Sequence, residues 1–171
     1  MTLPLGIANR RVAIGLALVT WGCVSMSMDQ TPALALVNES PSLPRGVYVR
    51  SWRAEPRVGN TVALDQPPPV AAAYLGGLGM PSEVRLIKRV AGGGGETACF
   101  ENGAVTVGRH RVASFERDRR GALLPRWTGC RVLKADELFL LGDTPGSFDS
   151  RYFGPVNRSA IEGVYREVLT W

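Results

Sequence analysis

The clearest strand pattern in the chain is EVRLIKRV at positions 83–90, which the glycine tract GGGG follows at 92–95. The stretch is short, rich in apolar residues and bounded by glycine, which is typical of a β-strand. Successive side chains of a strand point to opposite faces, so Lys88 is expected on the face opposite Ile87 and Arg89. We expect the glycine tract to end this strand.

Weaker strand patterns lie on both sides of this stretch. Residues 70–75, which follow three consecutive prolines, indicate a short helical turn. We expect a strand at 47–53 that pairs with a strand at 60–64, and a hairpin about Gly108 formed by 104–107 and 111–114. A further short apolar strand is expected at 138–141. Strands and helices do not alternate along the chain. The prediction is therefore a mainly β domain built on a coiled antiparallel sheet.

The composition of the chain fits one globular domain. Of its 171 residues 45% are hydrophobic and 20% charged, which excludes disorder, and Gly 20 with Pro 12 suits short strands joined by turns. The formal net charge is +5, but acids interrupt the one dense group of arginines, at 116–120. No aromatic residues interleave with a basic stripe, so nucleic acid is not an expected partner. A solvated loop is the favoured interpretation of 116–120, and anionic lipid headgroups are the alternative ligand.

The N-terminal segment predicts export from the cytoplasm. Arg10 and Arg11 precede an uncharged run at 12–28, which as a helix would span roughly 25 Å, just short of a hydrocarbon core of about 30 Å. The favoured interpretation is one uncleaved transmembrane helix whose arginines hold the N-terminus inside. A cleaved signal peptide is the alternative, because ALA at 33–35 fits the small-x-small rule.

The favoured interpretation divides the chain into four parts. They are a cytoplasmic N-terminus, a membrane anchor, a linker and an exported domain: 1–11, 12–28, 29–37 and 38–171. Under either interpretation of the N-terminal run, the domain lies outside the cytoplasm.

Export bears on the oxidation state of the cysteines. Cys99 and Cys130 would meet an oxidising compartment, and their spacing of 130 − 99 = 31 residues resembles neither a zinc motif nor a thioredoxin motif. We predict a structural disulfide between them, with two free buried thiols as the alternative. Cys23 falls in the hydrophobic run, where it serves as a small apolar residue.

Several familiar catalytic arrangements are missing from the sequence. A serine–histidine–aspartate triad would depend on His110, the one histidine, which falls in a polar hairpin. The sequence has no G-x-S-x-G, no H-E-x-x-H and no Lys-Ser or Lys-Thr after the glycine tract, so neither a metal nor a cofactor is expected. The arrangement that remains is a serine activated by a lysine.

Lys88 suits that chemistry. A free lysine has a pKa near 10.4 and is protonated at neutral pH, but burial in apolar surroundings can lower this pKa by several units. The chain has one other lysine, Lys134, and that lysine lies in a polar stretch. The alternative is an ordinary strand lysine whose ammonium group reaches solvent.

Three segments, in the expected order, resemble those of the type I signal peptidases (peptidase S26). SPSLPRGVY at 40–48 is similar to the nucleophile segment, in the S-x-P-x-G-x-Y form of the conjugative-transfer (TraF-type) branch. LIKRVAG at 86–92 resembles the general-base segment, and GDTPGSFDSRYFG at 142–154 resembles the C-terminal segment. The resemblance implies a signal-peptidase-like sheet domain on one N-terminal transmembrane helix.

The resemblance also implies catalytic roles. Ser42 would attack the scissile carbonyl, and Lys88 would take its proton as general base. The hydroxyl of Ser40 would bind the oxyanion together with the backbone N–H of Ser42. A hydroxyl that caps a turn is the alternative role for Ser40.

Three further residues receive supporting roles from the resemblance. Ser147 would orient the Lys88 amine, and Asp149 with Arg151 would form an ion pair that braces the site. A plain loop serine and a purely structural ion pair are the alternatives. The chain departs from the family where Gly92–Glu96 replaces the usual G-x-P-G-D turn.

The function implied is that of a membrane-anchored serine endopeptidase with a Ser/Lys dyad, single-pass in the bacterial inner membrane with its catalytic domain in the periplasm. Its substrate would be an exported precursor, in this branch a conjugative pilin, with cyclisation as an open alternative to hydrolysis. The lipid bilayer and the conjugative secretion machinery are the other expected partners. A general signal peptidase and an inactive assembly subunit of a secretion channel are the alternative functions.

Overall fold

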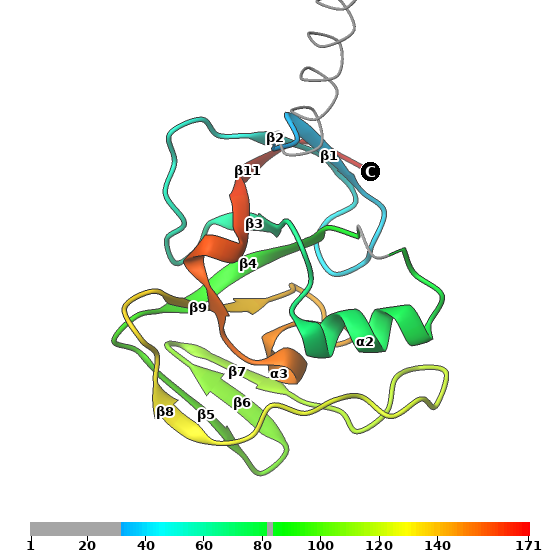
Figure 1. The fold of residues 1–171 in the computed structure, drawn as a ribbon, viewed down its shortest axis with the longest axis vertical. Helices are drawn as coiled ribbons and strands as arrows, with labels where there is room; N and C mark the ends of the chain where they lie inside the picture. Colours follow the sequence, from blue (N-terminus) through cyan, green and yellow to red (C-terminus); the bar gives the residue numbers. More distant parts are fainter. Residues whose placement is uncertain (1–31, 82–83) are drawn as a thin grey trace, which may run out of the picture. The chain divides into compact units, whose positions relative to one another are not determined.

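The structure, a computed structural model, describes residues 32–81 and 84–171 (Figure 1). The predicted cytoplasmic N-terminus and membrane anchor lie outside the described residues, as do the first three residues of the predicted linker, 29–31. In the part of the chain that is described, no helix combines the length and the apolar character needed to cross a membrane.

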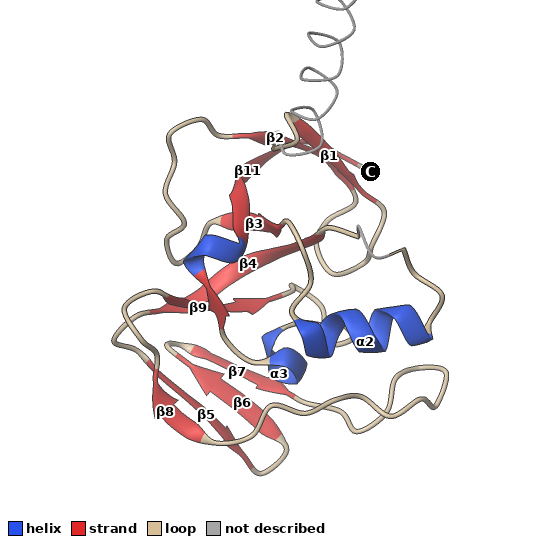
Figure 2. Ribbon diagram, in the orientation of Figure 1, coloured by secondary structure: helices blue, strands red, loops and turns tan. Residues whose placement is uncertain are grey.

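Seven strands form the main sheet, in the order β1-β2-β11-β3-β4-β9-β10 (Figures 1 and 2). All neighbours pair antiparallel. The strands are β1 (Ala35–Asn38), β2 (Gly46–Arg50), β3 (Thr61–Leu64), β4 (Leu86–Gly93), β9 (Glu137–Leu141), β10 (Val156–Asn157) and β11 (Ile161–Thr170). The predicted mainly β, antiparallel fold is confirmed, and its sheet begins within the segment predicted as a linker.

A second, smaller antiparallel sheet has the order β7-β6-β5-β8. Its strands are β5 (Thr97–Glu101), β6 (Ala104–Val107), β7 (His110–Ala113) and β8 (Cys130–Val132). The predicted hairpin about Gly108 is confirmed as β6 and β7. The helical elements are α2 (Pro69–Gly77), α3 (Ser150–Phe153) and the 3-10 turn η1 (Arg158–Ala160), and α2 lies beside α3 (Figure 2).

Two strand predictions are wrong. β2 and β3 do not pair with each other, because β11 lies between them and pairs with both. β4 also runs on through Gly92 and Gly93, which pair with Phe139 and Leu138 of β9. A Cβ on Gly92 would lie 2.4 Å from a methyl group of Val107, so the glycine lets the second sheet pack closely against the first instead of ending the strand.

The core lies on both faces of β4. The adjacent residues Val90 and Ala91 enter different apolar clusters. The pairing of β4 with β9 shifts register at this point, between Val90 and Gly92. Val90 packs with β3 and β9, whereas Ala91 packs between the two sheets with Phe139. Lys88 lies two residues before Val90 and therefore shares its face, as the alternation of the sequence predicted.

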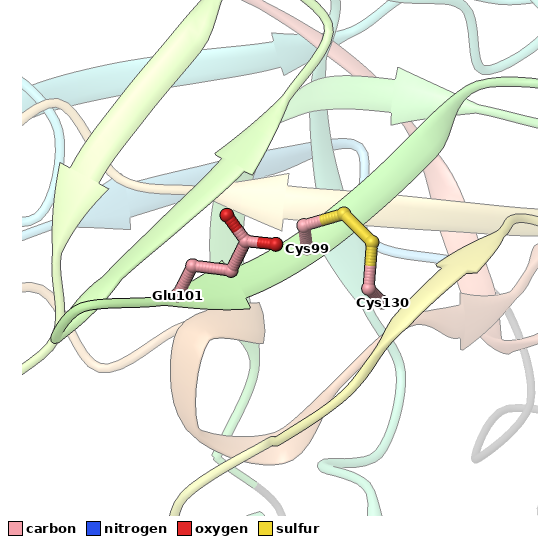
Figure 3. A group of neighbouring side chains, drawn as sticks. All are labelled: Cys99, Glu101 and Cys130. Atoms are coloured by element: carbon pink, nitrogen blue, oxygen red, sulfur yellow. A yellow bond between two sulfur atoms is a disulfide. The ribbon is translucent and has the colours of Figure 1, made fainter.

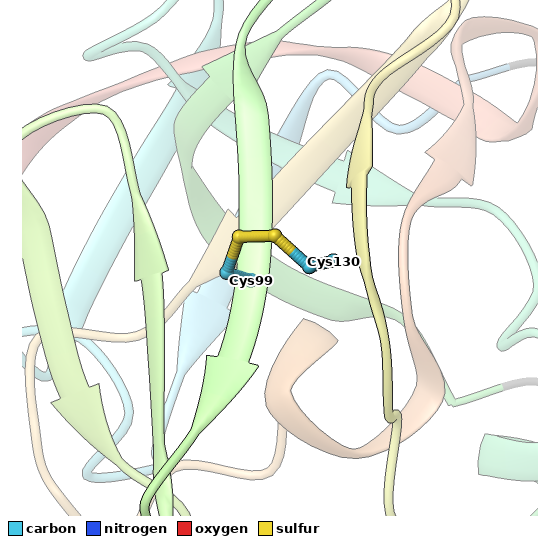
Figure 4. The surroundings of a disulfide bond; sticks show 2 residues. All are labelled: Cys99 and Cys130. Atoms are coloured by element: carbon cyan, nitrogen blue, oxygen red, sulfur yellow. A yellow bond between two sulfur atoms is a disulfide. The ribbon is translucent and has the colours of Figure 1, made fainter.

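The predicted disulfide joins Cys99 of β5 to Cys130 of β8, which lie directly opposite each other in the pair (Figure 4). On the chain-entropy estimate, a loop of this length contributes about 3 to 4 kcal/mol of stability. Glu101 brings its carboxylate within 4.8 Å of both sulfurs (Figure 3). Because metal ions bind thiolates and these sulfurs are oxidised, the three side chains do not offer a thiolate site.

Candidate active site

The loop of residues 39–45 connects β1 to β2 and is organised by Asn38. We call it the nucleophile loop because it carries Ser42, the nucleophile expected from the sequence. The Asn38 side-chain amide donates to the carbonyls of Ser40, Leu43 and Pro44 at 3.0, 3.1 and 3.0 Å. Its oxygen accepts from the Ser40 N–H at 3.1 Å. These bonds fix a proline-containing loop that cannot form regular structure of its own. Sequence reasoning missed Asn38, although asparagine before a turn commonly binds nearby backbone in this way.

Ser42 lies in this loop with only 6% of its surface exposed. The Ser40 hydroxyl donates to Ser42 Oγ at 2.8 Å and accepts from the Ser42 N–H at 3.1 Å. The Ser42 hydroxyl therefore accepts one hydrogen bond and keeps its own proton available to donate. In this conformation the Ser40 hydroxyl and the Ser42 N–H, the two groups predicted to bind an oxyanion, are hydrogen-bonded to each other.

Lys88 is buried in the middle of β4, with 3% of its surface exposed. It pairs with Val62 of β3, and the pairing of Arg89 with Leu141 places it beside Gly142 at the end of β9. Burial lowers the pKa of Lys88 to about 8, while the nearby Asp149 carboxylate raises this pKa and the Arg151 guanidinium lowers it. Lys88 therefore does not reach solvent in the manner of an ordinary strand lysine.

Gly142 joins the nucleophile loop to the C-terminal segment, residues 142–154. A Cβ on Gly142 would lie 2.2 Å from Ser147 Oγ and 2.8 Å from the Ser42 carbonyl oxygen, so only glycine fits. The next residue, Asp143, donates its N–H to the same carbonyl at 2.7 Å. Ser42 and Ser147 thus meet at Gly142, next to Lys88 of the neighbouring strand.

Ser147 is 2% exposed. Its hydroxyl is buried and has no hydrogen-bond partner among the residues that the structure describes. A buried polar atom without a partner costs about 1 to 3 kcal/mol, so this hydroxyl needs a functional or structural explanation.

Asp149 and Arg151 form a fully buried ion pair, as the sequence resemblance implied. Arg151 Nε and Nη2 donate to the two carboxylate oxygens at 2.8 and 2.9 Å. Asp149 also accepts from the N–H of Gly142 at 3.0 Å and from that of Arg151 at 3.2 Å. The guanidinium donates further to four backbone carbonyls, those of Ala113, Thr144, Pro145 and Ser147. The pair therefore fixes the C-terminal segment around Gly142.

Residues 7–171 match the model of the family described as signal peptidase, peptidase S26. The chain belongs to this family. As an S26 member it is a serine peptidase of the signal peptidase type, whose substrates are precursor proteins.

Three relatives of this S26 chain carry names from plasmid transfer. Two are plasmid transfer proteins TraF of Escherichia coli: one is 29% identical over 95% of this chain and 97% of its own length, the other 33% identical over 80% and 84%. A probable conjugal transfer protein TraF of Sinorhizobium fredii is 30% identical over 100% of this chain and 99% of its own length. The chain is therefore an S26 member of the TraF type, and its relatives indicate a membrane-associated or periplasmic location.

Among solved structures, the chain is similar to a signal peptidase I from Enterococcus faecalis V583, with a TM-score of 0.39 and 20% identity. The match covers 65% of this chain and 97% of that one.

Proposed function

We propose that the chain is a membrane-anchored endopeptidase in which Ser42 is the nucleophile and Lys88 the general base. The observation that carries this proposal is the buried Lys88, whose pKa is lowered to about 8, beside the glycine that contacts the Ser42 backbone. A lysine with a lowered pKa can be neutral near physiological pH and accept a proton. The other candidate base, His110, lies in the β6–β7 hairpin of the second sheet.

The reaction then has two steps. Ser42 Oγ attacks the scissile carbonyl carbon while its proton passes to Lys88 Nζ, and collapse of the tetrahedral intermediate breaks the C–N bond. The leaving amine takes the proton from Lys88, and an ester on Ser42 remains. Water or the amino group of a substrate attacks this ester, loses a proton through Lys88 and releases Ser42.

The oxyanion is bound by the Ser40 hydroxyl and the Ser42 N–H. These two groups bind each other in the free protein, so the incoming carbonyl oxygen has to displace that bond by rotation of the Ser40 side chain. Catalytic hydrogen bonds often become well aligned only with substrate present. The unpartnered hydroxyl of Ser147 supports its role as an acceptor that orients the Lys88 amine.

We propose a precursor of the conjugative apparatus, such as a pilin, as the substrate, because three relatives carry plasmid or conjugal transfer names. β1 is the edge strand of the main sheet and leads into the nucleophile loop. An extended segment of the precursor can pair with this edge and reach Ser42. Residues 12–28 anchor the chain in the inner membrane, so that the catalytic domain faces the periplasm.

The proposed function is tested by intact-mass spectrometry of a candidate pilin precursor incubated with full-length enzyme in membranes. The wild type is expected to give a processed pilin, and Ser42→Ala is expected to give none. A product lighter than the linear one by one water molecule would show cyclisation. Cleavage of many unrelated signal peptides would instead indicate a general signal peptidase, and normal pilus assembly with Ser42→Ala would indicate an assembly subunit.

The pH dependence of cleavage is expected to follow Lys88. The neutral amine is the active form, so kcat/KM should rise as pH increases through the Lys88 pKa of about 8 and level off above it. About one tenth of the sites are active at pH 7 and about nine tenths at pH 9, which predicts a roughly tenfold increase. Initial rates at low substrate concentration across this range provide the measurement. A flat profile, or one that falls with rising pH, would be inconsistent with Lys88 as the base.

A further inference from the structure

A pocket of about 630 Å³ lies beside the nucleophile loop, and the chemistry above makes no use of most of it. Pro41, which immediately precedes Ser42, and the buried Ser147 line one side. The other walls come from α2 and from the arginine loop, residues 115–124, which runs below α2 in Figure 1. Whatever occupies the pocket therefore lies within a few residues' length of the scissile bond.

The inner wall of the pocket is aromatic. Phe148 stacks on Tyr74 of α2 with ring centroids 4.5 Å apart and on Tyr152 of α3 with centroids 5.5 Å apart. All three aromatic residues line the pocket. They would bury an apolar side chain of an occupant.

The arginine loop is held in place by Asp118. Its carboxylate accepts from the Tyr74 hydroxyl at 2.7 Å and from the N–H groups of Arg120 and Ala122 at 2.8 and 2.9 Å. The first bond ties the loop to α2, and the other two close its turn. Asp118 thus accepts three hydrogen bonds, and the loop is arranged before any ligand arrives.

Three arginines of this loop line the pocket, and two of them are free to bind. Arg117 donates to the carbonyl of Gly121 at 2.7 Å. Within the described part of the chain, the side chains of Arg119 and Arg120 form no hydrogen bond and no salt bridge. The Arg119 guanidinium lies against Gly146, where an added Cβ would meet Nη2 at 3.3 Å. With one carboxylate, that of Asp118, the rim carries an excess of two positive charges.

We propose that this pocket binds a carboxylate-bearing, apolar segment of the precursor that lies close to the scissile bond. Arg119 and Arg120 would bind the carboxylate with the paired N–H geometry of guanidinium groups, and the aromatic wall would cover the neighbouring apolar side chain. This proposal rests on the proposed function, because it takes Ser42 as the point of cleavage.

The place of the pocket favours a peptide over a lipid headgroup as the occupant. Pro41 and Ser147 line it, so it opens beside the residue that would carry the acyl group of the precursor. Large exposed apolar side chains occur at β1 and at the end of β11 but also in the arginine loop, where Phe115 and Leu123 are exposed. Their positions therefore do not by themselves place a membrane surface, and the test below includes lipid vesicles.

The test measures peptide binding to full-length Ser42→Ala protein in nanodiscs of phosphatidylcholine. Two fluorescent hexapeptides are compared that differ only in glutamate or glutamine beside a leucine. The parent is expected to bind the glutamate peptide about tenfold more tightly, and Arg119→Gln/Arg120→Gln should reduce this preference to about twofold or less. Arg111→Gln/Arg166→Gln removes the same charge from exposed positions outside the pocket and should keep the preference.

Equal affinity of the parent for both peptides would overturn the proposal, as would a preference that survives in Arg119→Gln/Arg120→Gln. Co-sedimentation with phosphatidylglycerol vesicles gives a second readout. If Arg119→Gln/Arg120→Gln weakens vesicle binding, Arg111→Gln/Arg166→Gln does not, and the parent prefers neither peptide, the loop binds headgroups and the proposal fails. The binding test uses an inactive nucleophile, so its failure leaves the cleavage proposal intact. An acidic preference without any cleavage by the wild type would refute only the proposed function.

Discussion

Replacing Lys88 by methionine is expected to lower kcat/KM at least about 10⁴-fold and to make the folded protein more stable at pH 7. Methionine fills a similar volume but cannot accept the Ser42 proton. The activity loss follows from the missing base. The gain in stability follows from burial, because the wild type holds an ammonium group where water cannot solvate it.

The pKa of Lys88 gives the sign and the size of this stability effect. The folded-state pKa of about 8 lies below the ordinary value of 10.5, so the unfolded state binds the proton more tightly. Below about pH 8 the buried Lys88 ammonium therefore lowers the free energy of unfolding by roughly 3 kcal/mol. The folded state regains this stability as pH rises from 8 to 10.5. The Lys88→Met variant should lack this rise, and its free energy of unfolding at pH 7 should exceed that of the wild type.

Urea unfolding at pH 7 and at pH 10, with cleavage rates measured on the same samples, checks both effects. Lys134→Met is the matched control, because Lys134 is exposed, and it should change neither quantity much. A Lys88→Met variant that remains active would contradict the assignment of the base. A variant that loses stability at pH 7 would mean that Lys88 serves the structure instead.

Replacing Arg151 by methionine is expected to destabilise the fold by about 3 to 5 kcal/mol, because the Asp149 carboxylate would remain buried without its partner. Asp149 is 0% exposed and Arg151 1%. Four backbone carbonyls would also lose the donor that the guanidinium supplies. Chemical denaturation gives the free energy of unfolding directly.

Two further variants distinguish the stability lost through the unpaired charge from that lost through side-chain packing. Asp149→Asn combined with Arg151→Met keeps an oxygen for the Gly142 N–H but removes the buried charge, so it should recover part of the loss. Arg57→Met breaks a pair with Glu55 in which both side chains are more than three-quarters exposed, and it should cost less than about 1 kcal/mol. Equal losses for Arg151→Met and Arg57→Met would show that the buried pair does not brace the site.

The sequence was sufficient for the parts of the site that depend on local pattern. The alternation of residues 83–90 predicted the face of Lys88, and the prolines around Ser42 predicted a stiff loop without regular structure. The spacing of the cysteines and the expected export predicted the disulfide. In each case the property depends on neighbours in the chain, which a sequence displays directly.

The remaining features depend on residues far apart in the chain. β11 lies between β2 and β3, although more than 95 residues of sequence separate it from either, and nothing in the local pattern marks that pairing. Gly92 signals a turn by itself, yet packing against Val107 makes it part of a strand. The arginine loop is largely exposed, as the solvated-loop interpretation predicted, but the hydrogen bond from Tyr74 that ties Asp118 to α2 joins residues 44 positions apart.

Detection of an acyl-enzyme on Ser42 would test the proposed Ser42–Lys88 chemistry directly. Wild-type enzyme is mixed with the precursor, quenched in acid within the first turnover, and digested for peptide mapping by mass spectrometry. We expect a substrate segment esterified to Ser42 in the wild type and none in Ser42→Ala or Lys88→Met. An ester on another residue, or processed product from Ser42→Ala, would contradict that chemistry.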